Sequence, residues 1–165
     1  MKTVILTEPA LAPADALFRA GVERVVAKLG RAKPLDGGSL PEERAAVIAA
    51  LDGWADGAVD WRGELRRYYE EHIPVHVRPS ATVNTTLRRL KAAGIRLVWW
   101  SPGPAEATDV LLHHLGLARM LDDVVVGGSA TAAIVELGLE PADVTVVTDG
   151  VDQLVELSQQ TAVDL

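Results

Sequence analysis

The sequence predicts a doubly wound, Rossmann-like α/β fold, in which helices cover both faces of a parallel sheet. From residue 79 onward, short β-branched apolar runs alternate with helical patterns, an order typical of parallel strands joined by right-handed crossovers. A similar run opens the chain at Val4–Leu6, and a long helical stretch separates it from the others. We therefore expect a core of residues 1–13 and 79–165, with residues 14–78 inserted as a small helical unit.

The inserted stretch shows helical periodicity and contains residues that typically start and end helices. Gly30 ends the first helical face, and Pro41 followed by two glutamates is a typical helix start. Pro74 and Pro79 bracket a piece that we expect to be extended. The resulting assignment is helix over 14–29, loop over 31–40, helix from about 41 to about 51, and helix over 65–72.

The remaining elements follow one another regularly. The expected strands are residues 95–100, 124–126, 144–147 and 162–163. The expected helices are residues 83–91, which residues 92–94 end, and residues 105–115, 131–137 and 153–160. In an open parallel sheet, ligands bind at the carboxyl ends of the strands. That rule selects four segments, which are residues 7–10, 101–103, 127–129 and 148–152.

Composition excludes several classes of protein. With 165 residues, 48% of them hydrophobic and 24% charged, the chain is long and apolar enough to fold without a metal or disulfide. Cysteine is absent, which excludes thiolate zinc sites and cysteine nucleophiles and fits a reducing, cytoplasmic compartment. A net charge of −7 disfavours nucleic acid as a partner. No apolar run approaches the ~20 residues that span a bilayer, so we expect no membrane partner and no signal peptide.

Four passages in a fixed order resemble a known family. They are Lys91–Val98 before a strand, Ser101 after that strand, His114–Gly127 around the next strand, and Leu137–Gly150 leading into an acidic loop. Together they resemble the haloacid dehalogenase-like (HAD-like) phosphatases over nearly the whole chain. The resemblance implies that residues 14–78 are a helical cap, that Ser101 contacts phosphate, and that Asp149 stands in the acidic loop.

The sequence departs from the family pattern where the family's chemistry takes place. Thr7 and Pro9 stand where the resemblance implies two aspartates, one of which attacks phosphorus beside a magnesium ion. No lysine follows Lys91, so the family's phosphate-screening lysine is missing as well. Glu8 lies between the two changed positions, and strand alternation aims it away from Thr7. The sequence therefore predicts that the usual aspartyl-phosphate mechanism does not operate.

The remaining polar residues form a candidate ligand-binding set. Ser101 and nearby backbone amides could hold a small phosphate or carboxylate, although Ser101 could instead cap the following helix. Asp149 is either a weak metal ligand or the start of a turn with Gly150. The complete set of candidates is Thr7, Glu8, Ser101, Asp149 and Asp152.

Aromatic residues gather in the inserted stretch, at Trp54, Trp61, Tyr68 and Tyr69. They could line a cleft, pack onto the sheet, or form an interface with a protein partner such as a second copy of the chain. The favoured hypothesis is a pseudoenzyme without cofactor that binds a small anion or a protein, including as a homodimer. The alternative is a phosphatase-like hydrolase that depends on Asp149, and only that alternative calls for magnesium.

Overall fold

Four parallel strands form one sheet in the computed structural model, which describes residues 1–35 and 40–163. The strands are β1 (Thr3–Thr7), β2 (Arg96–Ser101), β3 (Asp123–Val126) and β4 (Val144–Val147), in the order β3-β2-β1-β4. The register pairs Ile5 of β1 with Val98 of β2 and with Val146 of β4. All four strands therefore end at the same edge of the sheet.

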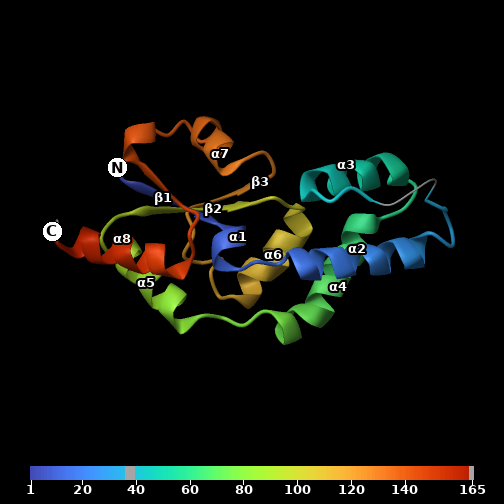
Figure 1. The fold of residues 1–165 in the computed structure, drawn as a ribbon, viewed down its shortest axis with the longest axis horizontal. Helices are drawn as coiled ribbons and strands as arrows, with labels where there is room; N and C mark the ends of the chain where they lie inside the picture. The colour runs from blue at the N-terminus through green and yellow to red at the C-terminus, as the bar shows by residue number, and fades with distance from the viewer. Residues whose placement is uncertain (36–39, 164–165) are drawn as a thin grey trace.

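Helices cover the sheet unequally on its two faces. They are α1 (Glu8–Leu11), α2 (Asp15–Leu29), α3 (Arg44–Ala55), α4 (Trp61–His76), α5 (Ala81–Ala92), α6 (Ala105–His114), α7 (Ala130–Glu136) and α8 (Val151–Val163), with a 3₁₀ turn at Pro141–Asp143. Figure 1 shows α1, α5, α6 and α8 on one face and α7 on the other. The larger face buries Leu6 and Trp99, and the smaller face buries Ile5 and Val98 against Ala133.

Helices α2, α3 and α4 lie beyond the edge at which the strands end (Figure 1). Helix α4 packs against both α2 and α6. Gly21 allows the close approach of α2 to α4, because a Cβ there would come within 2.7 Å of the Leu65 side chain. Across the described residues, no helix combines the length and apolar character needed to cross a membrane.

Several predicted element boundaries are wrong, and tertiary packing explains two of them. Helix α4 continues through Pro74, because its buried stripe extends to Ile73 and outweighs the local cost of proline. Residues 162–163 belong to helix α8 rather than to a strand, since α8 packs against α5 and buries Leu154. Helix α3 begins at Arg44 instead of Pro41, and Glu43 before it is still extended.

Two other predictions concern connecting segments. Residues 8–10 of the first segment selected for ligand binding belong to the single helical turn α1, which begins at Glu8. Residues 36–39 of the predicted loop lie outside the described residues.

Candidate functional site

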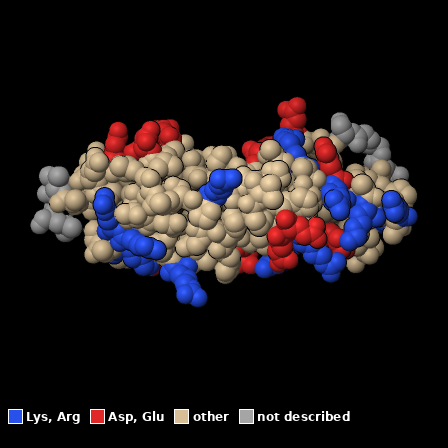
Figure 2. All heavy atoms as spheres, turned by 90° about the horizontal axis from the view of Figure 1, so that it is seen from below, with Lys and Arg blue, Asp and Glu red and all other residues tan. Residues whose placement is uncertain are grey.

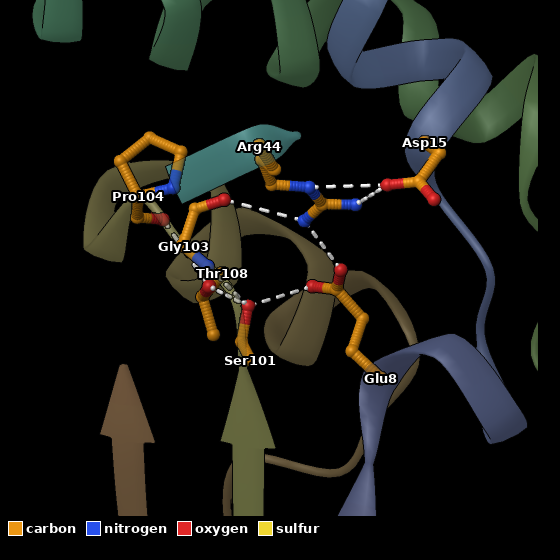
Figure 3. Close-up of polar contacts among 7 residues, drawn as sticks. All are labelled: Glu8, Asp15, Arg44, Ser101, Gly103, Pro104 and Thr108. Atoms are coloured by element: carbon orange, nitrogen blue, oxygen red, sulfur yellow. Dashed lines mark hydrogen bonds and ion pairs between the residues drawn. The ribbon is translucent and has the colours of Figure 1, made fainter. Parts of the chain in front are cut away.

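The carboxyl ends of β1 and β2 bring Glu8 and Ser101 together, 93 positions apart in the chain. Ser101 is fully buried, and its hydroxyl donates to Glu8 Oε1 at 3.0 Å. The Ser101 hydroxyl oxygen itself accepts from the Thr108 hydroxyl at 2.8 Å and from the Gly103 amide at 3.1 Å (Figure 3). A serine hydroxyl has one donor and two acceptor positions, so Ser101 is saturated by its own chain.

Ser101 does not cap the following helix, which was one of its two predicted roles. The residue before α6 is Pro104, and it makes no side-chain cap. The hydroxyl instead donates to the carboxylate of Glu8. Contact of Ser101 with a bound anion stays a prediction.

Arg44 completes the site from α3 (Figure 3). Its Nη1 lies 2.6 Å from Glu8 Oε2 and 3.2 Å from the Gly103 carbonyl oxygen. On the other side, its Nη2 and Nε lie 2.5 Å and 3.2 Å from Asp15 Oδ1. Both members of the Glu8–Arg44 pair are buried, at 2% and 8% exposure, whereas the Asp15 side chain is 74% exposed. We call these five residues (Glu8, Asp15, Arg44, Ser101 and Gly103) the ion-pair site.

Burial and charge oppose each other in the ion-pair site. Burial raises the pKa of the Glu8 carboxyl above its ordinary value, although the Arg44 charge and hydrogen bonds pull the other way. Burial also disfavours the charged form of Arg44, but Glu8 and Asp15 outweigh that effect and hold the pKa of Arg44 above its ordinary value. The guanidinium thus remains charged and compensates the carboxylate.

Sequence reasoning missed Arg44, although the sequence carries a signal for it. Arg44, Val47, Leu51 and Ala55 are the buried residues of α3, and they follow one helical stripe. A single arginine at the head of an otherwise apolar stripe indicates a buried cation, which requires a carboxylate partner.

The other predicted residues lie apart from this site. Thr7 is buried, and its hydroxyl donates to the Val147 carbonyl oxygen at 2.7 Å. Asp149 and Asp152 are exposed, and no hydrogen bond or ion pair joins either of them to Glu8 or Ser101 within the described chain. Gln153 accepts from the backbone amides of residues 148 and 149 and so organises the turn after β4.

The aromatic residues lie mostly inside the helical layer. Trp61 and Tyr69 are buried in the core, which agrees with the packing alternative and leaves neither side chain exposed to line a cleft or an interface. Trp54 is half-buried and donates to the Lys33 carbonyl, and the half-buried Tyr68 stacks on His72. A homodimer through these aromatic residues stays a prediction that depends on Trp54 and Tyr68.

Magnesium, which the family resemblance implies, does not fit the residues of the ion-pair site. Mg²⁺ prefers an octahedral set of oxygen ligands that includes carboxylates. Here both oxygens of Glu8 already accept, one from the Arg44 guanidinium and one from Ser101. Among the residues that the structure describes, no three acidic or histidine side chains form a metal-binding group.

Comparison with known proteins finds similarity in structure only. No protein-family model and no curated protein matches the sequence. CbbY from Rhodobacter sphaeroides in complex with phosphate is 18% identical, with a TM-score of 0.61 over 98% of this chain and 84% of that chain. A predicted phosphoglycolate phosphatase from Haemophilus somnus is 16% identical, with a TM-score of 0.57 over 98% and 82%. A putative β-phosphoglucomutase from Thermotoga maritima is 17% identical, with a TM-score of 0.52 over 96% and 82%.

These similarities establish the fold. The chain has the HAD-like fold, and proteins described as predicted or putative phosphatases are among its structural neighbours. The predicted doubly wound parallel sheet is confirmed.

Proposed function

We propose that this chain is a non-hydrolytic binding protein, a pseudoenzyme whose strand-end site is filled by its own side chains. The buried Glu8–Arg44 pair carries the proposal. Glu8 accepts the hydrogen bond of Ser101, the hydroxyl that the family resemblance assigns to phosphate. Arg44 brings to this edge the positive charge that a metal ion or a lysine supplies in the family pattern.

The chemistry of the neighbouring residues supports the same conclusion. Thr7 stands at the nucleophile position, and a hydroxyl nucleophile needs a base that accepts its proton. The acceptor beside Thr7 is the Val147 carbonyl oxygen, which does not take up a proton. Glu8 is a carboxylate, but its oxygens are held by Arg44 and Ser101.

We further propose that residues 14–78 act as a cap that the ion-pair site holds against the sheet edge. Arg44 belongs to α3 within this stretch, whereas Glu8 and Gly103 follow strands β1 and β2. Moving α3 away therefore requires separating a buried ion pair and a buried hydrogen bond.

A phosphatase-like hydrolase remains the second candidate. Two observations favour it, namely the phosphatases among the structural neighbours and the exposed carboxylate of Asp149 after β4. This candidate requires hydrolysis that magnesium stimulates and that Asp149→Asn abolishes.

Hydrolysis of an aryl phosphate, with and without magnesium, separates the two candidates. We expect wild type and Asp149→Asn to give the same background rate, and magnesium to leave both unchanged. Glu136→Gln is the matched control, because Glu136 is an exposed carboxylate at the end of α7. Magnesium-dependent turnover that persists in Glu136→Gln and disappears in Asp149→Asn would overturn the proposal.

A further inference from the structure

A cavity of about 220 Å³ lies where the chain passes twice between the sheet and helices α2–α4. Residues 11–13 line it from the first passage, between α1 and α2, and residues 76–78 line it from the second, between α4 and α5. The start of α5 and the segment after α6 complete the walls. We call it the linker cavity, and none of its lining residues belongs to the ion-pair site.

The walls and the size of the linker cavity suit a small molecule with an apolar body. Seven of its eleven lining residues are apolar, among them Leu11, Val77, Val83 and Leu117. A cavity of about 150 Å³ lined by apolar side chains binds benzene, so this volume suits about nine non-hydrogen atoms.

The polar residues of the cavity favour an anionic group on that molecule. Arg78 is exposed and forms no ion pair or hydrogen bond with any residue that the structure describes. His76 lies nearby in the lining, and no aspartate or glutamate is among the described lining residues, although the chain carries a net charge of −7. The first turn of the twelve-residue helix α5 also faces the cavity, and the positive end of a helix dipole favours anions.

The side chain of Asn84 favours a ligand that carries a hydrogen-bond donor. Its side-chain nitrogen donates to the Leu115 carbonyl oxygen at 3.4 Å, which fixes the orientation of the amide. Its side-chain oxygen is then buried without a donor from the described chain. A buried acceptor of this kind is costly to leave unpaired, and a hydroxyl on a ligand would satisfy it.

We infer that the linker cavity binds a small hydroxy acid, with its apolar tail between the walls, its carboxylate at Arg78 and its hydroxyl at Asn84. The inference deepens the proposed binding function by naming a class of ligand. Because the ligand would contact both passages between the sheet and α2–α4, its binding should also raise the melting temperature.

Titration of ¹⁵N-labelled protein with 2-hydroxyhexanoate, followed by NMR, tests the inference. We expect saturable shifts of amides around the cavity, with a dissociation constant on the order of 1 mM for a ligand of this size. Hexanoate lacks the hydroxyl and should bind about fivefold more weakly, and 1,2-hexanediol lacks the carboxylate and should bind at least about tenfold more weakly.

Two arginine variants locate the carboxylate. Arg78→Gln should weaken 2-hydroxyhexanoate binding at least about tenfold, the effect of losing a charge-assisted hydrogen bond. Arg88→Gln, which removes an exposed arginine of the same region on α5 outside the cavity, should leave binding unchanged. Both positions are exposed, so both variants are expected to fold.

Each outcome decides the inference. Absence of saturable shifts, shifts away from the cavity, or equal binding by wild type and Arg78→Gln would overturn it, and equal binding of hexanoate would overturn the role of Asn84. The aryl phosphate assay is read separately. If the protein hydrolyses the aryl phosphate and the cavity binds 2-hydroxyhexanoate, only the proposed function is overturned. If there is no hydrolysis and no binding, only the ligand class is overturned.

Discussion

Replacing Arg44 with methionine tests whether the ion-pair site holds α3 against the sheet. Methionine retains much of the apolar stem of arginine and removes only the cation, so the change is mainly one of charge. The variant leaves the Glu8 carboxylate buried, with Ser101 as its remaining hydrogen-bond donor. Glu8 must then either stay charged in a poorly polar site or take up a proton.

The free energy of protonating Glu8 sets how strongly Arg44→Met destabilises the protein. Protonating a glutamate of ordinary pKa, about 4.3, costs about 1.4 kcal/mol for each pH unit above that value, or about 4 kcal/mol at pH 7. This agrees with the range of about 3–5 kcal/mol for breaking a buried ion pair on one side. At about 3 °C per kcal/mol for a chain of this length, the melting temperature should fall by about 10 °C.

The destabilisation by Arg44→Met should depend on pH, which distinguishes it from a simple loss of packing. Without Arg44, the folded-state pKa of Glu8, already raised by burial, rises further. A raised folded pKa contributes stability that is complete below the unfolded value of about 4.3 and is lost as the pH increases through the folded value. The cost of Arg44→Met should therefore shrink to about 1 kcal/mol at about pH 5, apart from the lost contacts with Asp15 and Gly103.

Urea denaturation at both pH values, followed by tryptophan fluorescence, measures this cost. Arg66→Met is the matched control, because Arg66 also pairs with two carboxylates but is 42% exposed, and it should cost at most about 1 kcal/mol. The double variant Glu8→Gln/Arg44→Met should be more stable at pH 7 than Arg44→Met, since no buried charge is left unpaired. A cost of Arg44→Met equal to that of Arg66→Met, or independent of pH, would refute the reasoning.

Three further predictions concern packing and buried hydroxyls, and each is measured as the free energy of unfolding in urea. Gly21→Ala should destabilise the protein by about 1–3 kcal/mol although alanine favours helix, because its Cβ would lie 2.7 Å from the Leu65 side chain; a gain in stability would show that α2 and α4 separate easily. Tyr69→Phe should stabilise it by about 1 kcal/mol, because the Tyr69 hydroxyl is buried with no hydrogen-bond partner in the described chain; a clear loss would reveal a bond to that hydroxyl. Thr7→Val should cost about 1–2 kcal/mol by removing the 2.7 Å hydrogen bond to Val147, and a neutral result would contradict a structural role for this hydroxyl.

The sequence was informative where local pattern and chain order determine the result. The alternation of apolar runs and helices predicted the sheet, and the order of motifs placed Ser101 at the end of β2, as observed. Helix ends were less predictable, because Pro74 is a local signal that the buried stripe of α4 overrides.

The ion-pair site could be predicted only in part. Glu8 and Thr7 do have different partners, Ser101 and Val147. Strand alternation is not the reason, because β1 ends at Thr7 and Glu8 is the first residue of α1. The sequence does not indicate that Arg44, 36 positions away, reaches Glu8, because that contact depends on how α3 packs at the sheet edge.

A carboxylate at the end of a buried strand needs a compensating charge, and this requirement connects the ion-pair site to function. In the family pattern a metal ion or a lysine meets that need and leaves room for a phosphate. Here Arg44 meets it, and Glu8 takes up the hydrogen bond that Ser101 could give to an anion. A phosphate that reached this edge would meet the Glu8 carboxylate rather than free donors, and the two negative groups would repel. A phosphate can therefore bind there only after Glu8 has left Arg44 and Ser101. Opening the site then costs the free energy of separating the buried Glu8–Arg44 pair.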